Sequence, residues 1–325
     1  MNCSVAMATY NGAPYIEKQL KSILEQSIPV NEVVISDDGS SDGTLGIVET
    51  FISDNNLGES WRLIRNEDHG VRGNFYNAIR NCSGDIVFLC DQDDIWRNQK
   101  VQEVCKFFDE YPSALCVDTS FIFIDEDGNR IDKTYPKKTA NNGLILHEIG
   151  GGTEQIPLKL VINKNISPGM TMAVRKKAIN RWLDCTEKRC LHDWEINCVA
   201  ASMSGLFFLN KELVYYRIHS SQTVSIGNIK KRTKREILLE KIRNEKASID
   251  AQLGMVELAK KTGGNVQYLS RLERLLNTRA MVRQGNANCV LKEIGLYLCM
   301  VIRYGGRTKN IDIRYLFIDI ISTLV

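Results

Sequence analysis

The sequence predicts an α/β protein whose first 125 residues form a doubly wound, mainly parallel sheet. Two observations predict it. Short apolar runs of β-forming residues alternate with segments of helical periodicity, and several of these runs end in turns rich in Asp, Asn, Ser and Gly. Because ligands of open α/β sheets bind beyond the carboxyl ends of the strands, a functional site is expected at these turns.

The alternation divides residues 1–117 into five strands with helices between them. Pro14 fits the first turn of the first helix, because its missing N–H would have no partner there in any case. The expected strands are 3–8, 32–36, 61–65, 85–90 and 114–117, and the expected helices are about 14–25, 44–53, 72–81 and 98–111.

After residue 117 the pattern is less regular. Residues 121–124 and the Asp-rich turn behind them predict a hairpin, and the polar, Gly-rich residues 133–157 predict a mobile loop over the site. Further along, the sequence predicts a strand at 170–174, a helix from His192 to about Ser204, strands at 206–209 and 213–217, and helices from about 233 to the end.

Composition limits the class of protein. The 325 residues are 43% hydrophobic and 25% charged, which is typical of a globular chain of one or two domains. No apolar run reaches the ~18 residues that cross a bilayer, and no charged and apolar leader precedes the first strand, so we expect a cytoplasmic protein. The ten cysteines are scattered without a Cys-x-x-Cys pair, which favours buried thiols over disulfides or a zinc site.

The net charge of +3 is unevenly distributed. Residues 230–325 hold 19 Lys and Arg against 9 Asp and Glu, which leaves 23 against 30 for the rest of the chain. We therefore expect an acidic unit at 1–225 and a basic helical region at 226–325. Nucleic acid is not expected as a partner, since aromatic residues do not interleave the basic ones and the acidic unit would repel it.

The most informative stretch is a strand that runs into three carboxylates, Asp91-Gln92-Asp93-Asp94. Asp91 and Asp93 stand two positions apart, so in an extended chain both side chains point to the same side. Two such oxygen donors suit Mg²⁺ or Mn²⁺ shared with a phosphorylated substrate. The alternative is a solvated acidic turn after a strand.

Two further acidic turns are candidates. Asp38 to Asp42 fit part of an EF-hand loop, but a strand precedes them where an EF-hand requires a helix. Asp37 and Asp38 can instead present a carboxylate to a nucleotide, with Ser40, Ser41 or Asp42 left to cap the next helix.

The other candidates lie later in the chain. Asp193 begins a helix, where it acts either as a cap or as a general base beside an apolar sugar platform, Trp194. Arg217 and His219 alternate at a strand end, which suits phosphate pairing, metal ligation or a plain surface pair.

Taken together, these segments resemble the bacterial family 2 inverting glycosyltransferases of GT-A fold, over about residues 1–220. His192-Asp193-Trp194 is most similar to the rhamnosyltransferase-like branch. The other matching segments are Val5-Ala6-Met7-Ala8-Thr9-Tyr10-Asn11-Gly12, Val33-Val34-Ile35-Ser36-Asp37-Asp38-Gly39-Ser40-Ser41-Asp42-Gly43-Thr44, Ser83-Gly84-Asp85-Ile86-Val87-Phe88-Leu89 and Asp91-Gln92-Asp93-Asp94-Ile95-Trp96.

The resemblance implies a fold, a reaction and a role for each position. The fold would be a GT-A type, Rossmann-like mixed sheet flanked by helices, with a C-terminal helical region. The reaction would be a single displacement from a dTDP- or UDP-linked sugar to a hydroxyl of a polyprenyl-diphosphate-linked glycan, in bacterial surface polysaccharide synthesis. The implied residues are Thr9, Tyr10, Asn11, Asp38 and Asp91 for the nucleotide, Asp91, Asp93 and His219 for Mg²⁺ or Mn²⁺, His192, Trp194 and Arg217 for acceptor or phosphate contacts, and Asp193 as base.

Two other functions remain open from the residues. A sugar nucleotidyltransferase would share the architecture and the metal, but it needs a Gly-rich, basic loop after the first strand, and Asn11-Gly12-Ala13-Pro14 is not one. A non-catalytic nucleotide-sugar-binding module would not require Asp91, Asp93 and Asp193 to be present together. For the basic region, the amphipathic pattern predicts either docking on an anionic inner membrane surface or packing on the catalytic unit or in a homo-oligomer.

Overall fold

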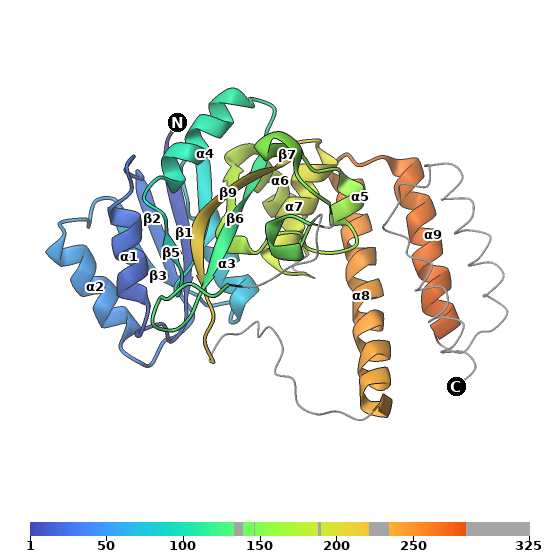
Figure 1. Ribbon diagram of the computed structural model, residues 1–325, viewed down its shortest axis with the longest axis horizontal. Coiled ribbons are helices and arrows are strands. Elements are labelled where there is room, and N and C mark those ends of the chain that lie inside the picture. Colours follow the sequence, from blue (N-terminus) through green and yellow to red (C-terminus); the bar gives the residue numbers. More distant parts are fainter. Residues whose placement is uncertain (133–138, 146, 188–189, 221–233, 284–325) are drawn as a thin grey trace.

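The computed structural model describes residues 1–132, 139–145, 147–187, 190–220 and 234–283. Within them the chain forms one nine-stranded sheet with helices on both faces, and two C-terminal helices lie at one end of the molecule (Figure 1). The strand order is β3-β2-β1-β4-β8-β6-β9-β5, and β7 pairs with β9 off this path.

The first half of the sheet is parallel, as the sequence predicts. Its strands pair in the order β3-β2-β1-β4, and one helix follows each of the first three strands. The strands are β1 (Cys3–Thr9), β2 (Glu32–Asp37), β3 (Trp61–Arg65) and β4 (Ile86–Asp91), and the helices are α1 (Ile16–Leu24), α2 (Thr44–Asp54), α3 (Val71–Arg80) and α4 (Lys100–Glu110).

The second half of the sheet is mixed. The short strand β8 (Met172–Arg175) runs antiparallel between β4 and β6 (Cys116–Ile124). β9 (Leu206–Arg217) is parallel to β6, whereas β5 (Ile95–Trp96) and β7 (Thr153–Gln155) are antiparallel to β9. The expectation of a parallel sheet through residue 125 is therefore wrong at β6, whose direct neighbours are β8 and β9 rather than β4.

Two pairs of predicted strands are single strands in the structure. Residues 114–117 and 121–124 fall on or just before β6, and 206–209 and 213–217 both fall in β9. The register between the two strands shifts on either side of Ser120. This irregularity interrupts the alternation of inward and outward side chains, which is why each long strand looks like two short ones in the sequence.

The predicted loop at 133–157 is partly structured. Residues 133–138 and 146 lie outside the described residues. The remainder contains two 3-10 turns, η1 (Asn141–Gly143) and η2 (Gly150–Gly152), and β7, which joins the sheet. Asn141 is buried. For the described residues the expectation of a mobile loop is therefore wrong; α5 (Leu158–Val161) and η3 (Gly169–Thr171) then lead into β8.

Alternation along the parallel strands places side chains in two separate cores. Val5 and Met7 of β1 face the core that is closed by α1, α2 and α4, whereas Ala6 faces the core closed by α3. The second core also contains side chains of α6 (Lys176–Cys185), α7 (His192–Ser202), α8 (Lys234–Thr262) and α9 (Val266–Arg283). All eight cysteines among the described residues are free thiols, six of them buried, as expected.

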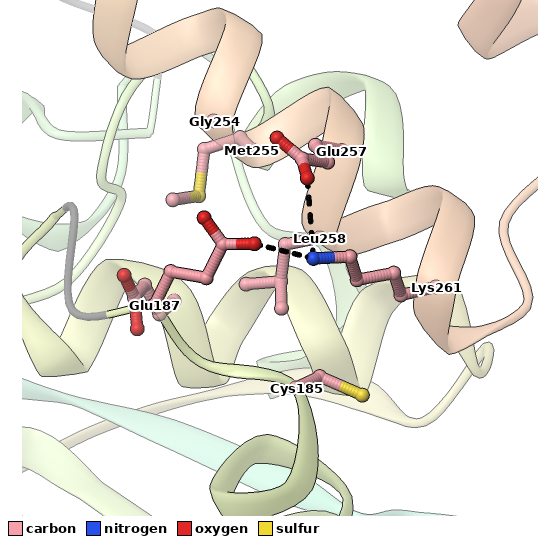
Figure 2. Close-up of a pocket in the computed structure, with 8 residues that line it drawn as sticks. Cys185, Glu187, Gly254, Met255, Glu257, Leu258 and Lys261 are labelled. Carbon is pink, nitrogen blue, oxygen red and sulfur yellow. Dashed lines mark hydrogen bonds and ion pairs between the residues drawn. The ribbon is translucent and has the colours of Figure 1, made fainter.

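The C-terminal helices are anchored on the face that carries α6 and α7. Figure 2 shows Lys261 of α8 pointing at two carboxylates, Glu187 after α6 at 2.5 Å and Glu257 one turn earlier on α8 at 3.1 Å. Met255 and Leu258 lie beside this pair and belong to the shared core. Of the predicted helices from 233 onward, those beyond residue 283 lie outside the described residues, and none of the described helices is long and apolar enough to cross a membrane.

Candidate active site

The carboxyl ends of β1, β2 and β4 lie side by side and bring the three polar turns together. Thr9 pairs with Asp37 across β1 and β2, and Ala8 pairs with Asp91 across β1 and β4. Gln92 joins two of the turns, because its side chain accepts a hydrogen bond from the Tyr10 N–H at 2.8 Å and donates one to the Tyr10 carbonyl at 2.9 Å. The sheet therefore places residues 9–12, 37–44 and 91–94 at one site.

The adjacent acids Asp37 and Asp38 have different environments. Asp37 is buried and accepts hydrogen bonds from the Thr9 hydroxyl at 2.8 Å and from two donors of Ser40. Asp38 is reached from another loop, by Asn66 Nδ2 at 2.7 Å and by the Gly70 N–H at 2.8 Å. Asp37 thus holds its own turn together, whereas Asp38 is less buried and is tied to the loop at residues 66–70.

The residues after β1 that are predicted to bind the nucleotide also differ from one another in burial. Thr9 is buried with its hydroxyl on Asp37, whereas Tyr10 has an exposed fraction of 55%. Asn11 adopts a left-handed φ of 48° and bonds across to the next turn, accepting from the Ser41 N–H at 2.9 Å. The N-cap of α2 is Gly43, which has no side chain to bond with, and not Ser40, Ser41 or Asp42 as expected; Asp42, one residue earlier, accepts from the N–H of the first helical residue, Thr44, at 3.1 Å.

Buried basic side chains hold the acidic turn after β4 in place. Asp94 is fully buried and accepts a hydrogen bond from the Arg217 N–H at 3.0 Å. The Arg217 guanidinium, also fully buried, donates to the main-chain carbonyls of Asp93 at 2.8 Å, Asp125 at 3.0 Å and Glu126 at 2.8 Å. These contacts give Arg217 a role in holding the turn, which differs from the predicted phosphate contact.

A second buried cation, Lys100, lies at the start of α4. Its ammonium donates to the Met170 carbonyl at 2.7 Å and stands 3.8 Å from the centre of the Trp96 ring. Burial lowers the pKa of Lys100 to about 7, although Cys90, Asp94 and Asp91 oppose that shift. Nothing in the sequence pattern singles this lysine out.

Asp93 and His219 meet at the open side of the acidic turn. His219 Nε2 lies 2.9 Å from Asp93 Oδ2, and its ring packs at a tilt of 38° against Tyr15, with centroids 4.6 Å apart. Burial raises the pKa of Asp91, and the neighbouring carboxyls of Asp93 and Asp193 raise it further. The three predicted metal ligands therefore share one side of the site.

The donor set fits a divalent cation shared with a substrate. Among the described residues, no group of three His, Cys, Asp or Glu side chains converges closely enough to hold a metal alone. Mg²⁺ sites in nucleotide enzymes do not need such a group, because one or two carboxylates and the substrate phosphates complete them. Asp91, Asp93 and His219 meet that requirement.

Asp193 lies near Asp91 although it is about 100 residues later in the chain, at the start of α7. It is buried, and its carboxylate accepts hydrogen bonds from the Trp194 N–H and from Asn165 Nδ2, each at 2.8 Å. Burial raises the pKa of Asp193 to about 6. A carboxyl group with a pKa near 6 is mostly ionised at neutral pH and still has appreciable affinity for a proton, so it is suited to accept one.

The residues on either side of Asp193 are packed rather than open. His192 is buried, stacks on Phe75 with centroids 3.9 Å apart, and has a pKa lowered to about 3 by burial, so its ring is neutral at physiological pH. Trp194 is half-buried and donates from Nε1 to the Val161 carbonyl at 2.6 Å. The structure thus places Thr9, Asp37, Asp91 and Asp93 at adjoining strand ends, with His219 on Asp93, whereas His192 and Trp194 are packed against Phe75 and Val161. The sequence pattern did not point to Lys100 or Asn165, which contact these segments.

Comparison with known proteins supplies a family and a fold. The model of the family described as glycosyl transferase family 2 matches residues 4–182. The dTDP-rhamnosyl transferase RfbG of Shigella flexneri is 31% identical over 227 residues, which are 67% of this chain and 73% of RfbG. The putative teichuronic acid biosynthesis glycosyltransferase TuaG of Bacillus subtilis is 32% identical over 130 residues, 40% of this chain and 50% of TuaG.

A solved structure has a similar fold at low sequence identity. The crystal structure of residues 1–349 of Staphylococcus aureus TarS in complex with UDP-GlcNAc superposes with a TM-score of 0.57 at 18% identity. The superposition covers 98% of this chain and 90% of that one.

Proposed function

The chain belongs to glycosyltransferase family 2, and from that membership we propose an inverting, metal-dependent transfer of a sugar from a nucleoside diphosphate to a glycan hydroxyl. The observation that carries the proposal is the contact of Asp93, in the acidic turn after β4, with His219 at 2.9 Å, beside a carboxyl from a distant part of the chain. That carboxyl is Asp193 at the start of α7, which lies near enough to Asp91 at the end of β4 to raise its pKa.

The nucleotide would bind at the ends of β1 and β2. Asp38 would accept a hydrogen bond from the pyrimidine base; its carboxylate is held by Asn66 Nδ2 and the Gly70 N–H, and each carboxylate oxygen can accept more than one hydrogen bond. Tyr10 offers an exposed ring, while Thr9 and Asn11 fix the turn. We propose a dTDP- or UDP-linked donor, because RfbG is named a dTDP-rhamnosyl transferase and TarS was crystallised with UDP-GlcNAc.

Asp91, Asp93 and His219 would hold Mg²⁺ or Mn²⁺. A bound cation would supply charge stabilisation to the departing diphosphate. Below the turn, Arg217 fixes the main chain of Asp93 through its carbonyl, so the carboxylate above is held in place before substrate arrives. Such preorganisation lowers the cost of reaching the transition state.

Asp193 would act as the general base. Its ionised carboxylate removes the proton from the acceptor hydroxyl, the acceptor oxygen bonds to the anomeric carbon, and the bond from that carbon to the nucleoside diphosphate breaks. Attack from the face opposite the leaving group inverts the anomeric centre. Because the pKa of Asp193 is raised to about 6, the base is ionised above that pH and retains affinity for the proton.

The acceptor and the site of action are further parts of the proposal. We propose a polyprenyl-diphosphate-linked glycan acceptor, with the basic region at 226–325 docking the enzyme on the inner face of the membrane or joining two copies. Residues 230–325 carry ten more basic than acidic side chains, and basic residues near an anionic leaflet contribute about 1 kcal/mol each. Co-sedimentation with anionic liposomes at low salt, lost at high salt and on truncation near residue 230, would support docking; no binding at low salt would exclude it.

The proposed activity is tested by ligand binding and turnover together. We expect UDP or dTDP with Mn²⁺ to raise the melting temperature, because a ligand that binds only the folded state stabilises it. With the matching nucleotide sugar and Mn²⁺, release of the nucleoside diphosphate should follow and should stop in excess EDTA. Binding without any turnover would instead support a non-catalytic nucleotide-sugar-binding module.

A further inference from the structure

Asp193 is held by a segment that lies outside α7, residues 165–171, which we call the clasp. Asn165 donates from Nδ2 to Asp193 Oδ2 at 2.8 Å, while the other carboxylate oxygen accepts from the Trp194 N–H at 2.8 Å. One of the two oxygens is therefore oriented by the helix itself. The other depends on a side chain from a separate part of the chain.

The clasp packs tightly against the start of α7. A Cβ atom at Gly169 would lie 2.9 Å from His192 Nε2 and 3.6 Å from Asp193 Cβ. The Gly169 N–H also acts as a hydrogen-bond donor that favours the ionised form of Asp193. The space, rather than an unusual backbone angle, is what requires glycine here.

The clasp is itself fixed by three elements. Buried Asn141 donates from Nδ2 to the Ile166 carbonyl at 2.8 Å and to the Ser167 hydroxyl at 2.7 Å. At its other end, Lys100 of α4 donates to Met170 and Thr119 of β6 to Thr171. A segment anchored in this way can hold the Asn165 amide at a constant place relative to both α7 and the acidic turn.

We propose that Asn165 is a positioning residue for the transfer reaction, whose amide orients the Asp193 carboxylate toward the acceptor hydroxyl and stabilises its ionised form. The role of Asn165 rests on the proposed role of Asp193 as base. Without the amide, Asp193 Oδ2 would lose its hydrogen-bond donor. The carboxyl group of Asp193 would then be less constrained, and its ionised form would be less stable.

The surroundings of Asp193 explain why one amide matters. The carboxyls of Asp91, at the end of β4, and Asp118, on β6, both lie near enough for Asp193 to raise their pKa, and by reciprocity they disfavour its ionisation. His192, on its own helix, is neutral. The groups that favour the ionised form are hydrogen-bond donors, namely Asn165 and the N–H groups of Trp194 and Gly169.

The test compares the titration of Asp193 in matched variants. Protein labelled with ¹³C at the aspartate carboxyls is titrated by NMR without metal or nucleotide, and the Asp193 signal is assigned from its absence in Asp193→Asn. Two variants remove the donor, Asn165→Ala and the nearly isosteric Asn165→Asp, so that a failure of one to fold leaves the other to decide. Asn141→Ala is the control, because it loosens the clasp without touching Asp193.

We expect the titration midpoint of Asp193 to move to higher pH in Asn165→Ala, further in Asn165→Asp, and by a smaller amount in Asn141→Ala, which loosens the clasp but keeps the Asn165 amide. A hydrogen bond to a charged group is worth about one tenfold step in ionisation. Release of dTDP from dTDP-rhamnose with Mn²⁺ should then fall about fivefold at pH 6 in Asn165→Ala, because the ionised fraction of Asp193 falls from about one half to about one tenth, and recover toward the wild-type rate at pH 8.5.

An unchanged midpoint in both Asn165 variants, or an equal shift in Asn141→Ala, would overturn the positioning role. This failure is distinct from failure of the proposed function. If Asp193→Asn turned over donor as well as the wild type, Asp193 would not be the base, whatever the NMR titration of the Asn165 variants showed.

Discussion

The acidic turn after β4 and the start of α7 each supply carboxylates to the same site, but they are built in opposite ways. Asp93 is partly open and in contact with His219, above a main chain fixed by the buried cation Arg217. Asp193 is buried, and the groups that favour its ionised form are neutral hydrogen-bond donors. The first region is suited to hold a cation and the second to exchange a proton.

The difference shows how one edge of a sheet can serve two chemistries. A carboxylate that binds a metal needs an oxygen free to reach it, and the end of a strand, where Asp93 lies, can provide this. A carboxylate that acts as a base needs an appreciable pKa, and burial at the start of α7 supplies it.

The largest effect is expected from Asp93→Ala, which removes the carboxylate nearest His219. Metal stabilisation of a leaving group is worth several kcal/mol, so turnover should fall by about 10³-fold or more. Calorimetry should show that Mn²⁺ no longer strengthens nucleotide binding. Asp109→Ala, an exposed acid on α4, is the control; a metal-independent wild-type enzyme would contradict the prediction.

Lys100→Met should have an intermediate effect, since it removes a buried charge behind the acidic turn without removing a ligand. The ammonium favours the ionised forms of Asp91 and Asp94, and partners of this kind typically change metal affinity by about 10–100-fold. Mn²⁺-dependent binding of UDP or dTDP should weaken by that factor, while binding without metal should change little. An unchanged Mn²⁺ dependence would show that the acidic turn does not need the cation.

Asp38→Ala should have the smallest effect of the three, because one hydrogen-bonding carboxylate toward the base contributes about tenfold in affinity. KM for the donor should rise by that factor, with kcat little changed. Asp37→Ala is the informative neighbour: it removes the acceptor of Thr9 and Ser40, so it should lower the melting temperature instead. If Asp37→Ala raised KM and Asp38→Ala lowered the melting temperature instead, Asp37 would be the nucleotide-binding acid and Asp38 the structural one.

The parallel half of the fold could be predicted from local patterns, and the mixed half could not. β1 to β4 and their helices appear close to the expected residues because each strand is followed in the chain by the helix that covers it. β8 begins at Met172, more than 80 residues after β4 starts, yet it lies directly between β4 and β6. Strand order of this kind depends on long-range pairing that no local pattern records.

The site follows the same rule. The sequence identified Asp91, Asp93 and Asp193 through their chemistry and spacing. The residues alone did not separate Asp37 from Asp38, and only the family resemblance favoured Asp38, because the contacts that distinguish the two acids come from Asn66 and Gly70 on another loop. Nor could the sequence identify Asn165, a common residue in a loop, whose role depends on where the fold places Asp193.

The central claim is that Asp193 is the base, and the most direct measurement is the pH dependence of kcat for the wild type and Asp193→Asn. The wild-type rate should rise through about pH 6 and level off above it, as the carboxyl ionises. Asp193→Asn should lose this rise and about 10²–10⁴ in kcat, with donor affinity retained.

The stability of the same variant provides the control for folding. A carboxyl whose pKa is raised by burial stabilises the fold only while protonated, and this contribution is lost as the pH rises through about 6. At pH 8 the asparagine carries no charge to bury, so Asp193→Asn should melt no lower than the wild type. A folded Asp193→Asn enzyme with the wild-type rate and pH profile would contradict the account.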